Sequence, residues 1–388
     1  ALGKRALQIL FVLFLIGVVA AIIAIKEGHH VLGTTDEVPW GIQIATYVFF
    51  VVSSTGLCLV SSLGHVFGYK TFVPIAKKAI FFALITLVLG FSVIATELGF
   101  PLRLGVMAVI SPNFSSPIWW MGALYGLYAV LISIELFYLF HENHAKARVA
   151  GILSIIAAIV AHSNLGAVFG LLYSRPYWHG PFLPIYFIAS ALLCGAAILI
   201  IIVYYTDYYQ NNKVIKSENE QLLVALGKLL TLFVGIIIFF TTWKLITGIS
   251  GHHHHKYDVI SAFMIDPMPI GFWAMETVIG LLIPFGILLS RYRKDPFYIS
   301  LAGIFPMIGI FFMRYNFVYA GQVFSLKPVV GQMGQEITYL PPLKGSASTF
   351  LNYTPSTVEM LIVVGSISAA ILAYVIGSNV LKVKHIEE

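Results

Sequence analysis

Residues 6–25 read ALQILFVLFLIGVVAAIIAI, twenty residues without a single charged side chain. A helix needs about 20 such residues to cross the ~30 Å hydrocarbon core of a bilayer. Apolar runs of similar length recur along the chain, and proline, glycine or charge marks each gap between them. We predict ten spans, approximately at 6–25, 40–67, 79–99, 117–140, 149–173, 182–205, 222–246, 270–290, 297–319 and 358–380. The fold class expected is therefore an all-α integral membrane protein.

The overall composition supports this interpretation. The chain has 388 residues, of which 59% are hydrophobic and only 10% are charged. A soluble domain carries roughly 25% charged residues, so lipid must cover most of the exterior here. The formal net charge of +6 is best explained by membrane topology and anionic lipid, and we expect no nucleic-acid partner.

The first apolar run has an alternative interpretation as a signal peptide, because Lys4 and Arg5 precede it. The run is long for the apolar region of a signal, and no small-residue cleavage site follows at Lys26-Glu27-Gly28. We therefore expect a retained helix. The short region 100–116 cannot span the bilayer and is expected to be a surface or re-entrant segment.

Lys and Arg residues are distributed unevenly between the two sides that alternate along ten spans. One side, which includes both termini, holds 14 of them and the other side holds 6. Basic loops favour the cytoplasm, so we expect both termini in the cytoplasm of a prokaryote and the long polar loops 247–269 and 320–357 outside. The membrane would be the prokaryotic cytoplasmic (inner) membrane.

A faint repeat suggests how the spans are grouped. Tyr47 and Gly56 in the second span recur as Tyr186 and Gly195 in the sixth span. This predicts two four-helix bundles, spans two to five (40–173) and spans six to nine (174–319). The first span with its loop (1–39) and the last loop with the tenth span (320–388) would be peripheral. Small residues also recur by chance in membrane helices, because close packing selects them.

The chain offers few ligands for a redox metal. Its two cysteines, Cys58 and Cys194, are too few for an iron–sulfur cluster, which takes about four thiolates. Only His162 among the histidines is clearly buried in a span, because His65 is at the far end of its helix and the others fall in loops or at helix ends, so a haem held by two histidines is not expected either. We predict no metal, haem or iron–sulfur cluster in this chain.

Ionisable groups at membrane depth are costly and mark candidate functional positions. Glu97, Lys244, Glu276 and Arg314, with Asn316, fall near the outer ends of their spans. Lys244 is close enough to a helix end to reach the surface with its amine. Arg314 needs a carboxylate or an equivalent set of acceptors at its depth, and Glu276 and Glu97 are the candidates.

Other polar residues lie deeper or toward the inner side. His162 belongs to a polar cluster with Ser163 in an otherwise apolar span, and it suits either a functional or a network role. His65 and Glu135 lie in the inner halves of the second and fourth spans. They could outline a proton path from the cytoplasm, or Glu135 could only fix the packing of neighbouring helices.

Several of these residues form a pattern that strongly resembles one family. Residues 162–170 read HSNLGAVFG and are followed by Arg175-Pro176-Tyr177-Trp178, while the ninth span ends in Arg314-Tyr315-Asn316 and then Gly321-Gln322. With the opening Pro39-Trp40-Gly41 of the second span, this resembles the NrfD/PsrC family of membrane subunits of polysulfide-reductase-like complexes. The ten spans are similar to the subunits of Dsr, Hmc and Qrc respiratory complexes and of alternative complex III, with the DsrP-like type favoured.

The resemblance implies a subunit that binds menaquinone, or another quinone, near the outer face. It further implies an outer-face (periplasmic) iron–sulfur cluster protein as partner, along with other subunits of a membrane redox complex active in anaerobic respiration or sulfur metabolism. The rival hypothesis is a secondary transporter or ion channel, which buried charges and a repeat would also fit.

Quinone chemistry then assigns roles to the polar residues. A quinone carbonyl needs a hydrogen-bond donor, and two-electron reduction needs two protons. We predict that catalysis involves His162, Glu97, Glu276 and Arg314. We predict cofactor contacts from Trp40, Arg103, Trp120, Ser163 and Asn316. The tryptophans have an alternative role as an interfacial aromatic belt.

Overall fold

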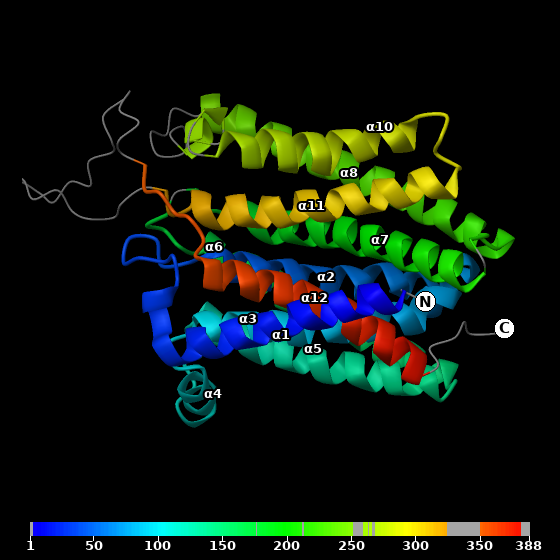
Figure 1. The fold of residues 1–388 in the computed structure, drawn as a ribbon, viewed down its shortest axis with the longest axis horizontal. Helices are drawn as coiled ribbons and strands as arrows, with labels where there is room; N and C mark the ends of the chain where they lie inside the picture. Colours follow the sequence, from blue (N-terminus) through cyan, green and yellow to red (C-terminus); the bar gives the residue numbers. More distant parts are fainter. Residues whose placement is uncertain are drawn as a thin grey trace, which may run out of the picture.

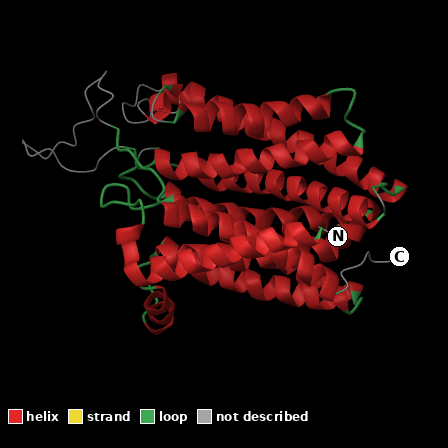
Figure 2. Ribbon diagram, viewed as in Figure 1, coloured by secondary structure: helices red, strands yellow, loops and turns green. Residues whose placement is uncertain are grey.

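The molecule is a stack of long, nearly aligned helices joined by short loops (Figure 2). The computed structural model describes residues 3–175, 177–211, 213–250, 259–262, 264–265, 268–323 and 350–381, without the side chain of Leu104. In the predicted polar loops 247–269 and 320–357, residues 251–258, 263, 266–267 and 324–349 lie outside the described residues. Within the described ranges there is no strand, and ten helices there are long and apolar enough to cross a membrane. The predicted fold class, an all-α protein with ten spans, is therefore confirmed.

The helices follow one another in a simple up-and-down order (Figure 1). The ten spans contain α1 Lys4–Glu27, α2 Ile42–His65, α3 Ala76–Glu97, α5 Pro117–Phe140, α6 His144–Gly170, α7 Phe182–Gln210, α8 Ser217–Ser250, the π-helical η3 Ile270–Leu282 continued by α10 Ile283–Leu289, α11 Pro296–Ala320 and α12 Thr357–Val380. Short helical segments at Gly28–Val31 (η1), Lys70–Ile75 (η2) and Pro101–Ile110 (α4) join some of them.

Local sequence signals place several helix starts. The Ser116 hydroxyl accepts from Trp119 N at the start of α5, and Pro117 occupies the first turn, where a missing N–H costs nothing. At α12, Ser356 and Glu359 cap each other's backbone in a reciprocal capping box. Both helices therefore begin where the apolar runs predicted a span.

Burial separates a central helix from a peripheral one. In the apolar window of α2, 89% of residues are buried, against 17% for α1. The central helix α2 contacts α3, α6, α7 and α11, whereas α1 packs mainly on α12. In Figure 1 the α1–α12 pair lies across one side of the stack.

The remaining contacts form two rings of neighbours. Helices α2, α3, α5 and α6 contact one another in a closed circuit, and so do α7, α8, η3 with α10, and α11. The two rings meet where α7 packs against α2 and α6, and where α11 packs against α2. The candidate site described below lies within the second ring.

Glycines allow the closest helix crossings. A Cβ atom on Gly56 would collide with the backbone of α7 at Ala191, and one on Gly195 would collide with Gly56. The two glycines of the proposed repeat therefore meet each other where the rings join. A Cβ atom on Gly280 of η3 would lie 2.5 Å from the Cα of Gly309 in α11, so these helices also touch backbone to backbone.

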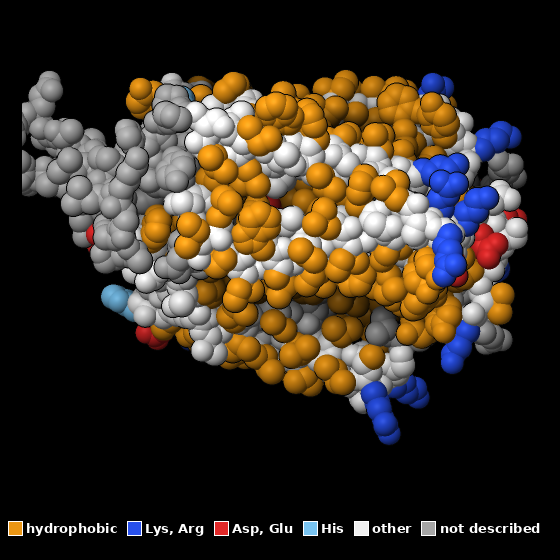
Figure 3. Space-filling model, turned by 90° about the horizontal axis from the view of Figure 1, so that it is seen from above, with side chains coloured by type: hydrophobic (Ala, Val, Ile, Leu, Met, Phe, Trp, Pro, Cys, Tyr) orange, Lys and Arg blue, Asp and Glu red, His pale blue; other side chains and the backbone are white. Residues whose placement is uncertain are grey.

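The two ends of the helix stack differ in charge. Lysine and arginine side chains gather at one end, as Figure 3 shows, and in Figure 1 helix α1 begins and helix α12 ends toward that end. We call it the basic end, and the opposite end the pocket end. Helix α4 lies crosswise at the pocket end (Figure 1) with most of its residues exposed. This position agrees with a surface segment rather than a spanning one.

Candidate functional site

A cavity of about 490 Å³ opens at the pocket end between α7, α8, η3 and α11. Its size falls within the range of small-molecule sites, roughly 300–1,000 Å³. Aromatic side chains form much of its wall, including Trp178, Phe182 and Phe240. Its polar wall residues are Tyr177, His179, Tyr186, Trp243, Lys244, Thr247, Glu276 and Asn316.

Two predicted site residues, Glu276 and Asn316, meet in this wall. Both side chains are buried, and Asn316 Nδ2 donates to Glu276 Oε2 over 2.8 Å. Glu276 Oε1 and Asn316 Oδ1 have no hydrogen-bond partner among the described residues. Buried polar atoms are normally paired, and these two unpaired acceptors belong to residues of the cavity wall.

Lys244 and two tyrosines extend the polar wall. The Lys244 amine lies 6.0 Å from the ring centre of Tyr177 and 5.9 Å from that of Tyr186. Burial, together with nearby Glu276, raises the pKa of Tyr177 well above its ordinary value, so this phenol stays protonated. The sequence predicts that Lys244 reaches toward the membrane surface. In the structure Lys244 lines the cavity instead. Lys244, Tyr177 and Tyr186 were not among the predicted site residues.

Arg314 lies directly behind the cavity and is fully buried. Its Nη2 donates to the hydroxyl of Ser190, and its guanidinium carbon lies 4.5 Å from the ring centre of Phe187. No carboxylate of the described chain lies within 4.0 Å of it, and Nε and Nη1 have no hydrogen-bond partner there. The charge is therefore held by a hydroxyl and an aromatic face, not by the expected Glu276 or Glu97.

His162 is a neighbour of Phe187 but does not line the cavity. Its Nε2 lies 3.2 Å from the Phe187 carbonyl oxygen, which can only accept, so Nε2 carries the proton. Nδ1 then accepts from the Tyr125 hydroxyl over 2.9 Å. Both ring nitrogens are thus used to join α6 to α5 and α7, and a catalytic role for His162 stays a prediction.

Glu97 also points away from the cavity, toward the first turn of α2. Its Oε1 accepts from Gly41 N over 2.7 Å. Nearby, Tyr353 donates to Glu359 and accepts from Ile42 N. Two buried carboxylates therefore hold the start of α2, and the contribution of Tyr353 and Glu359 was missed because both are far from α2 in sequence.

Trp40 forms the layer behind the cavity wall. Its ring stacks on Trp178, with centres 5.1 Å apart and an interplanar angle of 23°. The Gln322 amide accepts from Trp40 N and donates to Trp40 O, which fixes the backbone. Trp178 in turn donates to the Phe317 carbonyl. Trp40 thus supports the wall through Trp178 without lining the cavity.

Three further predicted contacts lie elsewhere. Arg103 is exposed on the crosswise helix α4, and Trp120 is 41% exposed near the start of α5. Ser163 is partly buried on α6. None of the three lines the cavity. The structure therefore brings Glu276 and Asn316 together and leaves these residues apart from them.

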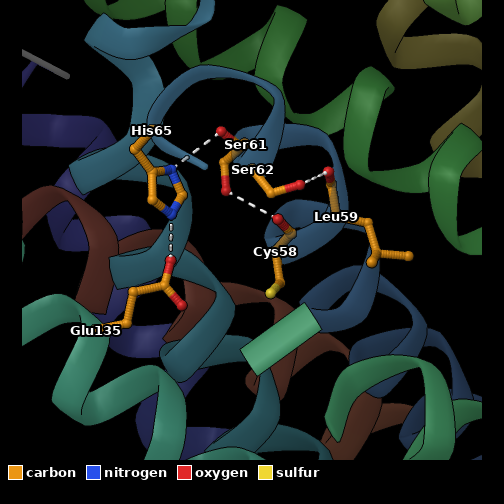
Figure 4. A network of polar contacts seen from close by, with 6 residues as sticks. All are labelled: Cys58, Leu59, Ser61, Ser62, His65 and Glu135. Carbon is orange, nitrogen blue, oxygen red and sulfur yellow. Dashed lines mark hydrogen bonds and ion pairs between the residues drawn. The ribbon is translucent and has the colours of Figure 1, made fainter. Parts of the chain in front are cut away.

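A second polar site joins α2 and α5 toward the basic end. His65 Nε2 and Glu135 Oε1 are 2.7 Å apart, and Figure 4 shows the two side chains pointing toward each other. His65 Nδ1 lies 3.2 Å from the Ser61 carbonyl, so Nδ1 must carry a proton. The 2.7 Å contact between His65 Nε2 and Glu135 Oε1 then needs a second proton, which is held by either the imidazole or the carboxyl. The two side chains therefore share one proton across this contact.

More polar side chains lie along α2 between this pair and His162. The Tyr128 hydroxyl donates to the Ser54 carbonyl over 3.1 Å, and it also contacts the Cys58 thiol. Thr55 is 3.4 Å from His162 Nδ1. These groups recur on one face of α2 and form a discontinuous polar row within the first ring.

Comparison with known proteins places the chain in a family. The family model "Polysulphide reductase, NrfD" matches residues 30–326. The chain belongs to the NrfD family. With its ten apolar helices it is a multi-pass membrane protein. The match covers both rings and ends just after α11, so it includes every residue of the candidate site.

Relatives of this NrfD-family chain cover it almost completely. It is 26% identical to a selenate reductase subunit of Mesobacillus selenatarsenatis, over 96% of this chain and 92% of that protein. It is 28% identical to the Hdr-like menaquinol oxidoreductase integral membrane subunit of Archaeoglobus fulgidus, over 94% of this chain and 91% of that protein. It is 25% identical to a putative dimethyl sulfoxide reductase membrane subunit of Halobacterium salinarum, over 97% of this chain and 90% of that protein.

Proposed function

We propose that this chain is the quinone-reactive membrane subunit of an oxidoreductase complex and that menaquinone, or another quinone, binds in the cavity at the pocket end. The observation that carries the proposal is the pair of unpartnered buried atoms, Glu276 Oε1 and Asn316 Oδ1, in an aromatic wall. The name of the Archaeoglobus relative, a menaquinol oxidoreductase subunit, supports the choice of ligand.

The wall residues fit both redox forms of such a ligand. Quinol hydroxyls donate, and the free oxygens of Glu276 and Asn316 can accept from them. Quinone carbonyls accept, and the tyrosine hydroxyls or the Lys244 amine can donate. Reduction of a quinone takes up two electrons and two protons, and oxidation releases them. Glu276 is the group placed to give or take a proton, and Asn316 orients its carboxyl.

The electrons require a partner, and the relatives are named as membrane subunits or lettered subunits of reductases and of a menaquinol oxidoreductase. We propose an iron–sulfur protein bound at the pocket end, close above the cavity, because electron transfer needs a short gap. The basic end would then face the cytoplasm. Cross-linking from residues 259–262 should capture a cluster-bearing subunit of the purified complex; capture of only a second copy of this chain would contradict this arrangement.

Orientation has a direct test. Single cysteines at Ser325 and Ser346, which lie outside the described residues, should react with an impermeant reagent added to intact cells. A cysteine at Asn211, at the basic end, should react only after the membrane is opened. The reverse pattern would place the cavity on the cytoplasmic side.

Blocking the cavity tests the proposed site itself. Thr247→Trp introduces an indole into the cavity wall, whereas Thr242→Trp changes the same helix at an exposed position outside the wall. In the purified complex we expect the first variant to lose most of its turnover with a soluble quinol analogue and the second to keep it. Equal turnover in the two variants, with both complexes assembled, would move the quinone site elsewhere.

The His65–Glu135 pair supports a second part of the proposal, a proton path from the basic end. Its shared proton and the polar row along α2 provide groups that can accept and pass protons. In this proposal protons consumed or released at the cavity are coupled to the cytoplasm through α2, α5 and α6. The Glu135→Gln test is given in the Discussion.

A further inference from the structure

A second hollow lies on the side of the molecule, between the α1–α12 pair and helices α7 and α11. Its volume is about 980 Å³, and its wall is almost entirely apolar. We call it the lateral groove. Figure 1 shows the start of α1, marked N, near the ends of α7 and α12 at the basic end. The groove lies in a region that the quinone proposal does not use.

The length of the lateral groove matches one leaflet of a bilayer. Along α12 its wall runs from Ile367 to Asn379, which is about 18 Å at 1.5 Å per residue. Half of the ~30 Å hydrocarbon core is about 15 Å. Asn379 is near the end of α12, so the groove extends from the membrane centre to the basic end.

The volume of the groove is suited to long hydrocarbon chains. A cavity of roughly 150 Å³ takes up one benzene ring, so the lateral groove has room for about six such six-carbon units. This is the carbon content of two acyl chains. The wall residues Phe49, Ile202 and Ile371 are of the kind that packs against such chains.

The deep part of the groove offers no free donor for a quinone ring. The hydroxyls at this depth are those of Ser53 and Thr86, whereas Tyr205, Thr206 and Tyr374 line the half of the groove toward the basic end. Ser53 donates to the Phe49 carbonyl over 2.8 Å, and Thr86 donates to the Ala83 carbonyl over 3.0 Å. Both hydroxyl protons are therefore used within their own helices. This argues for an acyl chain and against a redox headgroup at this depth.

The mouth of the groove, at the basic end, is polar and exposed, unlike its apolar deep part. Tyr209, Gln210 and Asn379 lie there and are exposed. Arg5 is exposed one turn before Ile9, which lines the groove, and the wall contains no acidic residue. A phosphate group would find a cation and hydrogen-bond donors at this position.

We propose that the lateral groove is a binding site for one anionic diacyl phospholipid of the leaflet at the basic end. The acyl chains lie between α12 and α11, and the phosphate lies at Arg5, Gln210 and Asn379. The lipid fills the space between the peripheral pair α1–α12 and the second ring. It thereby joins parts of the fold that have few direct contacts there. This inference does not depend on the proposed function.

Native mass spectrometry of the purified full chain, with added phosphatidylglycerol or phosphatidylcholine, tests the site. We expect wild type to bind one phosphatidylglycerol, with about fivefold preference over phosphatidylcholine. Arg5→Gln should remove the preference. Lys4→Gln, which removes the same charge about 100° away around the helix, should keep it. Loss of the preference in both variants, or in neither, would overturn the headgroup assignment.

Groove-filling variants test the acyl-chain part. Ile371→Trp places an indole in the groove, and Ile308→Trp does so from α11 on the opposite wall. Ile376→Trp is the control, because Ile376 is exposed on α12 outside the groove. We expect the first two to lose the bound lipid and the control to retain it. Equal lipid retention by all folded variants, or loss of a mass that equals a quinone, would overturn the proposal.

Discussion

Glu97 and Glu276 are the same residue type at the pocket end of two helix rings, yet their surroundings differ. Glu97, in the first ring, accepts from Gly41 N through Oε1 and holds the start of α2. Glu276, in the second ring, accepts from Asn316 through Oε2. The second oxygen of each carboxylate has no partner in the described chain, but only Glu276 belongs to the wall of the cavity. The difference shows that a buried carboxylate acquires its role from what packs against it. Depth in the membrane does not distinguish the two.

The largest expected effect separates the two carboxylates by turnover. Glu276→Gln keeps the hydrogen-bonding shape but cannot exchange a proton, so quinol turnover of the intact complex should fall about 100-fold. Glu97→Gln keeps an acceptor for Gly41 N and should have a much smaller effect. The control is Glu218→Gln, an exposed residue at the basic end. If Glu97→Gln were the more damaging change, the quinone site would belong to the first ring.

The second prediction concerns coupling rather than turnover. Glu135→Gln removes the exchangeable proton from the pair with His65 while preserving a hydrogen bond. In proteoliposomes we expect charge movement to fall and quinone turnover to survive. Unchanged turnover and charge movement together would exclude Glu135 from the path. Failure of the complex to assemble would instead support the alternative in which Glu135 only fixes the packing of α2 against α5.

The third prediction addresses the structural role of the first-ring carboxylate. Glu97→Leu leaves the buried N–H of Gly41 without its acceptor, which should cost about 1–3 kcal/mol of stability. The midpoint of thermal unfolding in detergent measures this loss. Glu276→Leu leaves the Asn316 amide without its acceptor, but Asn316 lines the cavity, where water can replace the lost partner, so the midpoint should fall less. An equal loss of stability in the two variants would contradict the assignment of a capping role to Glu97 and of a ligand-binding role to Glu276.

The smallest effect is expected behind the cavity wall. Trp40→Phe weakens the stack on Trp178, and aromatic pairs contribute about 0.5–1.5 kcal/mol beyond their buried area. We expect a modest rise in KM for the quinol analogue with little change in kcat, because Trp178 still lines the cavity. Trp120→Phe, at an exposed position remote from the cavity, is the matched control. A large fall in kcat would indicate that Trp40 contacts the ligand itself.

The fold class and the approximate position of each span can be predicted from the sequence alone. Hydrocarbon demands about 20 apolar residues in a row, and this requirement is local, so it can be read without knowing which helices touch. The polar residues within spans could be found for the same reason, since each is conspicuous in its apolar surroundings. Glu276, Asn316, His65 and Glu135 were identified in this way. The NrfD family could also be identified, because its motif lies within short segments.

Which of these residues lie together could not be predicted, because it depends on how the helices pack. Glu276 and Asn316 meet because Gly280 and Gly309 let η3 and α11 touch backbone to backbone. Lys244 faces the cavity because α8 packs on α7 and α10 with that side turned inward. Glu97 was assigned to the same site as Glu276, but Tyr353 and Glu359 share its task at the start of α2 from more than 250 residues away. Side-chain partners of this kind depend on the rotation of each helix about its axis. The packing of neighbouring helices sets this rotation. The apolar pattern of the sequence does not set it, because it is nearly uniform around a span.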